Sequence, residues 1–136
     1  MQVIDRITIQ VIEHQNNILQ ARFLNSIVLN IFFRGTVCRH QDITLYTYLK
    51  LDASNPCLYG FKRESEKNLF SALLLVAGLG FKTAFLIMEQ KQEEIIEAVL
   101  NGDEIFFEKI RGVGPSLISK MLSEKKFIKA MQSLTE

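Results

Sequence analysis

The chain has 136 residues, a formal net charge of +1 at pH 7, 48% hydrophobic residues and 23% charged residues. This composition is typical of a globular protein with a packed core, and no apolar run is long enough to span a membrane. Residues 1–62 contain six Lys and Arg against four acids, and residues 63–136 contain ten against eleven. Neither half belongs to the strongly basic class of nucleic-acid binders, so any contact with nucleic acid must use local cations and backbone amides.

Alternating apolar and polar residues predict short strands in the first 62 residues. The expected strands cover residues 3–11 (Val3, Ile7, Ile9 and Val11), 18–23, 27–33, 43–51 and 57–61. Turn residues separate them, including Asn16-Asn17 and Asn55-Pro56. Five strands within about sixty residues are too few for a sandwich and predict a small closed barrel of the OB-fold type.

Helical spacing replaces this alternation from Glu64 onward. Leu69, Phe70, Leu73 and Leu74 mark one buried face, and Ile95, Ile96, Val99 and Leu100 repeat that spacing. Asn101-Gly102 is a helix-end signal, Asp103 a candidate N-cap, and Pro115 is suited to a first helical turn. We expect five helices here, and an α+β protein with an OB-fold barrel domain over residues 1–62 and an all-α domain over 63–136.

Two Gly-x-Gly turns, 34 residues apart, are the most informative motif: Gly78-Leu79-Gly80 and Gly112-Val113-Gly114. Each follows one apolar helical stretch and precedes another, which is the layout of a helix-hairpin-helix. Glycines lack Cβ and tolerate positive φ, so such a turn can bring backbone N–H groups close to a ligand. One such turn alone is weak evidence, but two at matched positions favour binding of phosphates along a nucleic-acid backbone.

The residues between the two halves resemble those of the RuvA family, bacterial subunits that bind four-way (Holliday) junctions. The run Leu58-Tyr59-Gly60-Phe61 precedes Glu66-Lys67, Leu69-Phe70 and the first Gly-x-Gly in the family order. Lys82 and Thr83-Ala84 extend the match beyond that turn. The similarity is specific over residues 58–122 and architectural over residues 1–57.

The resemblance implies structure-selective, non-enzymatic junction binding in recombination and repair. It also implies a cytoplasmic homotetramer or octamer that works with a RuvB-type ATPase, which drives branch migration, and with a junction resolvase. The residues expected to contact DNA are Gly78, Gly80, Lys82, Thr83, Gly112, Gly114, Ser116 and Lys120.

Four departures from the family pattern affect these expectations. The family has a third, ATPase-binding domain behind a flexible linker, and this chain stops at Glu136, about where that linker would begin. The family's acidic pin at the junction centre is reduced to Asp52. The second hairpin has Pro115-Ser116 in place of basic residues, so Lys120 is its nearest cation. The turn at Leu24-Asn25-Ser26 lacks the expected glycine.

No pattern in the sequence predicts catalysis, a cofactor or a metal. There is no phosphate-binding Gly-x-x-x-x-Gly-Lys loop, no carboxylate cluster of the two-metal type, and no Asp beyond Asp103 to serve a glycosylase. Cys38 and Cys57 lack ligand spacing, so we expect buried free thiols in a reducing compartment. Asp5 and Arg6 stand where a signal peptide would need apolar residues.

Two other functions remain open at this stage. In the first, the hairpins have no DNA affinity and the chain is a structural subunit of a larger complex. In the second, the barrel binds single strands by stacking bases on Phe32, Phe33, Tyr46 and Tyr48, although these aromatics also suit core or interface packing.

Overall fold

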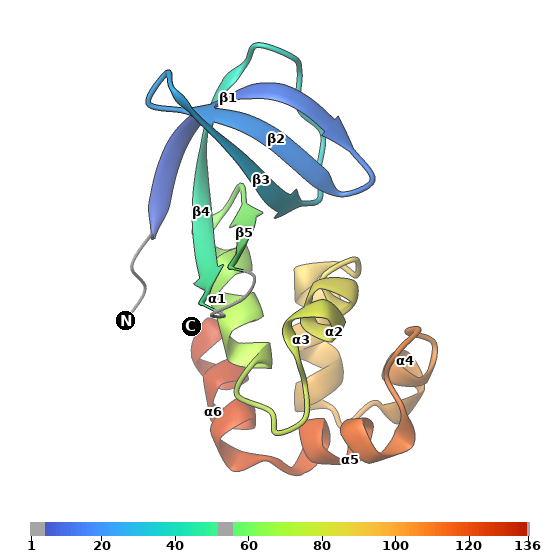
Figure 1. The fold of residues 1–136 in the computed structure, drawn as a ribbon. Coiled ribbons are helices and arrows are strands. Elements are labelled where there is room, and N and C mark those ends of the chain that lie inside the picture. The colour runs from blue at the N-terminus through green and yellow to red at the C-terminus, as the bar shows by residue number, and fades with distance from the viewer. Residues whose placement is uncertain (1–4, 52–55, 136) are drawn as a thin grey trace. The chain divides into compact units, whose positions relative to one another are not determined.

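The computed structural model describes residues 5–51 and 56–135 (Figure 1). The chain divides into two compact units, Met1–Lys67 and Asn68–Glu136. The expected domain boundary at residue 62 remains a prediction, since the helix that begins at Glu64 starts in the first unit and ends in the second. Val3 and Asp52, both named in the sequence predictions, lie outside the described residues.

The first unit is a closed barrel of five strands, as expected for an OB-like fold (Figure 1). The strands are β1 (Arg6–Gln15), β2 (Ile18–Phe23), β3 (Ile27–Phe33), β4 (Asp42–Lys50) and β5 (Cys57–Phe61). They close in the order β1-β2-β3-β5-β4, with only β3 and β5 parallel among the described strand pairs. Their inward residues form the barrel core: Ile7, Ile9, Val11, Leu19, Ala21, Ile31, Phe33, Leu45 and Leu58.

Two turns of left-handed backbone connect the first three strands. Asn16 and Asn17 have φ of +53° and +63° and join β1 to β2 through the pair Gln15–Ile18. Asparagine tolerates this conformation, and its hand suits the twist of a hairpin. Leu24 and Asn25 repeat the geometry with φ of +55° and +62°. The predicted turn without glycine therefore places a leucine in a conformation that side chains disfavour.

Gly60 lies inside the barrel, where β5 passes between two apolar side chains. A Cβ atom at this position would be 2.9 Å from Ile31 Cγ2 and 3.1 Å from Leu45 Cδ1. Real Cβ atoms essentially never come as close to another carbon as the first distance, and the second is tighter than most real contacts, so neighbouring groups in this dense core would have to move. The glycine in the run Leu58–Phe61 is therefore required by the close packing of three strands.

Six helices follow residue 63 in the described part of the chain, one more than expected. They are α1 (Glu64–Leu73), α2 (Phe81–Ile87), α3 (Gln92–Leu100), α4 (Glu104–Glu108), α5 (Pro115–Ser123) and α6 (Lys125–Leu134). The additional helix arises because α2 ends at Ile87 and Lys91 caps a separate α3. The expected N-cap is confirmed, since Asp103 Oδ1 accepts a hydrogen bond of 3.2 Å from the Phe106 N–H.

The solvent exposure of Cys38 and Lys67 differs from what their residue types suggest. Cys38 is exposed and Cys57 is half-buried, so the prediction of buried thiols is wrong for Cys38, which lies in the loop between β3 and β4. Lys67 is only 6% exposed although it is charged. Its ammonium donates a hydrogen bond to Asp5 Oδ1, and this bond and the lysine's charge lower the pKa of the Asp5 carboxyl.

Candidate nucleic-acid interface

The two Gly-x-Gly turns have nearly the same backbone conformation. The first glycines, Gly78 and Gly112, have φ of +85° and +89°. The second glycines, Gly80 and Gly114, have φ/ψ of −88°/178° and −90°/172°. Positive φ is therefore confined to the first glycine of each turn, and the second glycine has an extended backbone that other residues can also adopt.

The middle residue of each turn anchors the hairpin in the helical core. Leu79 and Val113 are 5% and 7% exposed. Their backbone N–H groups donate to the carbonyls of Val76 and Ile110, at 3.1 and 3.3 Å. With the middle side chain held inside, both glycines of each turn are left on the surface.

Gly80 and Gly114 are the N-caps of α2 and α5, and neither helix has a side-chain cap. Ordinarily a serine, threonine or aspartate at this position would accept hydrogen bonds from the first-turn N–H groups. A Cβ atom built on either glycine meets nothing within 4 Å among the described residues. The open surface beside the uncapped helix starts can admit an anion, although Pro115 removes one N–H donor from the second.

The cations expected at the hairpins lie mainly at the first one. Lys82 is exposed on the first turn of α2, whereas Ser116 is the exposed residue at the matching place on α5. Lys120 was expected beside the second hairpin, but its ammonium is 3.6 Å from the Cβ position of Gly78. The sequence neighbourhood of Lys120 misleads here, because α5 extends from its own hairpin toward the other. Thr83, the next residue, is half-buried.

Acidic side chains accompany both hairpins and were not predicted. Glu124 Oε2 accepts a hydrogen bond of 3.3 Å from the Ala77 N–H, next to the first turn. At the second turn, Glu104 and Glu108 line a hollow of about 290 Å³ together with Pro115 and Ser119. No spacing rule in the sequence relates Glu124 to Ala77, which lie 47 residues apart.

Comparison with known proteins supports the resemblance in part. No protein-family model matches the chain. A protein of Bacillus cytotoxicus, "Holliday junction branch migration complex subunit RuvA", is 38% identical over 87 residues, which are 63% of this chain and 42% of that protein. This chain is similar to RuvA.

Other relatives with the same description support this partial and divergent similarity. The protein of Geobacillus sp. is 35% identical over 89 residues, or 65% of this chain and 44% of the relative. That of Bacillus thuringiensis is 37% identical over 87 residues, or 63% and 42%. The chain thus matches about two fifths of the length of these RuvA proteins, and the expected resemblance is confirmed to that extent.

The aromatic residues proposed for single-strand binding differ in their availability. Phe33 is fully buried in the barrel core and has no face free for a base. Phe32 stacks on Tyr59, with ring centroids 4.9 Å apart and an interplanar angle of 20°. The Arg6 guanidinium lies 5.9 Å from the centre of the Tyr46 ring. Phe33 is thus excluded as a surface on which a base could stack, and one face of the Phe32 ring is covered by Tyr59.

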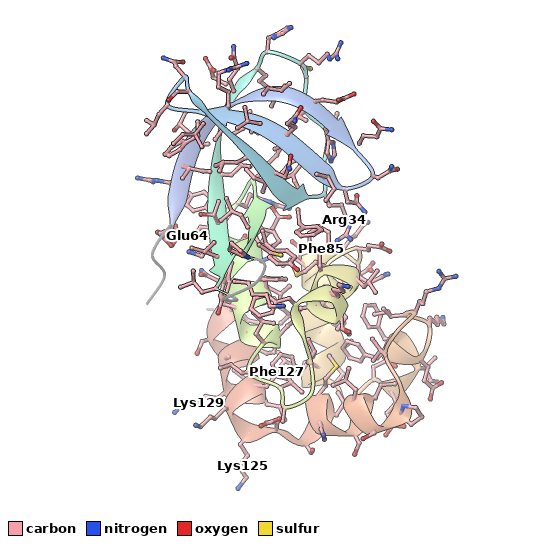
Figure 2. All side chains as sticks on the ribbon, viewed as in Figure 1. Arg34, Glu64, Phe85, Lys125, Phe127 and Lys129 are labelled. Atoms are coloured by element: carbon pink, nitrogen blue, oxygen red, sulfur yellow. The ribbon has the colours of Figure 1, made fainter. Side chains whose placement is uncertain are left out.

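The basic residues of α6 lie on its outer face. Lys125 and Lys129 point away from the neighbouring helices, while Phe127 points inward and is fully buried (Figure 2). This arrangement is typical of a solvated amphipathic helix. Within the described residues, no cluster of three or more His, Cys, Asp or Glu side chains could hold a metal, and none of the helices could span a bilayer.

Proposed function

We propose that this chain binds four-way junction DNA by its phosphate backbone and has no catalytic role of its own. The observation that supports this most strongly is the pair of matched hairpins, each with an exposed N-cap glycine that leaves open surface at a helix start. Backbone amides and lysines recognise phosphates, which are the same for every base sequence. The chain is therefore expected to select the shape of DNA and ignore its sequence.

The assembly that follows from this proposal is a homotetramer, or an octamer of two tetramers, in the cytoplasm. A subunit with a net charge of +1 has little long-range attraction for DNA. Several linked copies would bind far more tightly, since each bound hairpin raises the effective concentration of the others. A RuvB-type ATPase and a junction resolvase are the proposed partners, in keeping with the branch-migration complex named for the relatives.

Near-neutral charge favours one second candidate, a structural subunit whose hairpins no longer hold DNA. The two functions are distinguished by measuring the affinity of the chain for a four-way junction, a linear duplex and a single strand in one buffer. Junction binding at least about tenfold tighter than duplex binding supports the first, a threshold well below the roughly 10³-fold or more that usually separates specific from non-specific DNA binding. Absence of binding to all three supports the second, and preference for the single strand points to the barrel.

A further inference from the structure

Glu124 stands at the junction between α5, the helix that follows the second hairpin turn, and α6. Its backbone N–H donates to the Lys120 carbonyl at 2.9 Å, and its carbonyl accepts from the Ile128 N–H at 3.0 Å. Although Glu124 is the N-cap of α6, its carboxylate does not cap that helix. Instead, Oε2 accepts a hydrogen bond of 3.3 Å from the N–H of Ala77, the residue before the first turn. This side chain therefore bonds the end of the second hairpin's helix to the first hairpin.

Side chains also pass between the two hairpins in both directions. The Lys120 ammonium of α5 lies 3.6 Å from the position that a Cβ atom of Gly78 would take. In the reverse direction, Leu86 Cδ1 of α2 lies 3.6 Å from the same position at Gly112. Both of these contacts are made by the ends of flexible side chains, whereas the carboxylate bond is directional and holds the backbone next to the turn itself. Of these three connections, the carboxylate bond constrains the first turn most closely.

The first turn needs such a restraint because it is built around glycines. Gly78 has a φ of +85°, and glycine has more backbone freedom than any other residue. The direction of the chain through Ala77 and Gly78 sets where Gly80, the N-cap of α2, presents the first helical N–H groups. A carboxylate that accepts from a backbone N–H makes one of the stronger hydrogen bonds in proteins. Holding the Ala77 N–H therefore limits the orientations that this helix start can take.

We propose that Glu124 is a positioning residue, which fixes the first hairpin turn relative to the second so that both present their N–H donors at the spacing of one DNA backbone. This inference rests on the proposed function and adds a residue that acts through the turn and not by touching DNA. Two weak sites on one rigid support bind better than two that move independently, because the cost of ordering them is met before binding. The Glu124 charge itself repels a phosphate, so the bond that it makes, and not its charge, accounts for its place beside the first hairpin.

Two substitutions of Glu124 separate its reach from its charge. Glu124→Gln keeps the length of the side chain and an oxygen acceptor but removes the charge. Glu124→Asp keeps the charge and provides a preferred N-cap for α6, but its side chain is one methylene shorter. Since the wild-type bond of 3.3 Å is already long, the aspartate carboxylate falls short of the Ala77 N–H. Glu97→Gln is the matched control, because it removes the charge of an exposed glutamate on α3.

Each variant is measured by urea unfolding, by the hydrogen-exchange rate of the Ala77 amide in NMR spectra, and by its affinity for a four-way junction. Glu124→Asp should keep or raise the stability of the fold, since it improves the α6 cap. It should nevertheless weaken junction binding about tenfold, because a hydrogen bond to a charged acceptor contributes enough to shift an equilibrium by about that factor. The Ala77 amide should exchange about tenfold faster in this variant for the same reason.

The two glutamine variants should behave differently from Glu124→Asp. Glu124→Gln should keep the Ala77 amide protected and bind junctions at least as tightly as the wild type. Glu97→Gln should leave the Ala77 exchange rate unchanged and should not weaken binding. Affinity should therefore follow the reach of the side chain at position 124 and not its charge.

The opposite pattern would overturn the inference, with wild-type affinity in Glu124→Asp or an equal loss of affinity in Glu124→Asp and Glu124→Gln. An unchanged exchange rate of the Ala77 amide in Glu124→Asp would also overturn it, and this measurement needs no DNA. If Glu124→Asp does not fold, Glu124→Ser, which is also a preferred N-cap and too short to reach Ala77, takes its place. Failure of the wild-type chain to bind junctions would instead contradict the proposed function, so the two failures are distinguishable.

Discussion

Gly78 and Gly80 stand two positions apart in the same turn, yet their φ angles have opposite signs, +85° and −88°. The first glycine is needed for its backbone conformation, and the second occupies an N-cap position that any residue can adopt. The same pair of roles recurs at Gly112 and Gly114. One substitution made at both positions of a turn should therefore have two different consequences.

Gly78→Ser should destabilise the protein by about 1–2 kcal/mol, because a side chain at positive φ brings Cβ close to the following carbonyl. Gly112→Ser should cost a similar amount. The measurement is urea unfolding of each variant beside the wild type. A decrease in stability below about 0.3 kcal/mol at both sites would show that the turns relax to negative φ, since the strain expected of a side chain there is several times larger.

Gly80→Ser should leave the stability equal or raise it by about a few tenths of a kcal/mol, because serine is a slightly better N-cap than glycine and meets open space here. Junction affinity should fall by about tenfold, since the serine oxygen takes the N–H donors that a phosphate would use. Binding titrations and unfolding curves on one preparation test both parts. Unchanged affinity in folded Gly80→Ser and Gly114→Ser would exclude these helix starts as phosphate sites.

Gly60→Ala should destabilise the barrel by about 1–3 kcal/mol, the usual cost of overpacking a core. The added methyl group would have to displace Ile31 or Leu45, both fully buried. Unfolding by urea measures the effect, and Gly80→Ala is a suitable control because its methyl group enters open space. Equal stability of the two variants would mean that β5 can shift without cost.

Asp5→Asn should destabilise the protein at neutral pH, because it leaves the buried Lys67 charge without its carboxylate. The pKa of Asp5 is lowered in the folded state, so its contribution is present above the ordinary value of about 3.9. It is lost as pH falls from that value through the lowered pKa. Urea unfolding of wild type and variant between pH 7 and pH 3 should show the difference in stability shrinking only at the acidic end. A difference that stays constant over this range would contradict the ion pair.

Junction binding should depend on self-association of the chain. At concentrations where light scattering shows only monomer, affinity should be weak, and it should rise as the oligomer forms. A chain that stays monomeric while it binds junctions tightly would contradict the tetramer proposal.

The strands of the barrel could be predicted well from sequence, because the alternation of apolar and polar residues depends only on neighbouring positions in the chain. Alternation placed four of the five strands within one residue of their observed ends, and the positive φ of Asn16 and Asn17 agrees with the predicted turn. The long helices were predicted from the spacing of their apolar residues, which is also a local pattern. The break between α2 and α3 was missed because Met88–Lys91 contains no glycine or proline to mark it.

The hairpin glycines could be found from sequence, but the charges around them could not be assigned. Lys120 follows the second turn in the chain, and yet its ammonium lies beside the first turn, just as the Leu86 side chain lies beside the second. Superimposing the two repeats by 34 residues would have paired it with Leu86, but only the structure shows that this position faces the opposite hairpin. Glu124 beside Ala77 depends on the same tertiary arrangement.

The central claim is tested most directly by titrating the chain into labelled four-way junctions of two unrelated sequences. A linear duplex of equal length is titrated beside them at the same salt concentration. The wild-type chain should bind both junctions with the same affinity and the duplex at least about tenfold more weakly. The Gly80→Ser/Gly114→Ser double variant should lose most of the junction affinity while remaining folded. Equal affinity of the wild type for junction and duplex, or a strong preference for one junction sequence, would contradict recognition of junction shape through the backbone.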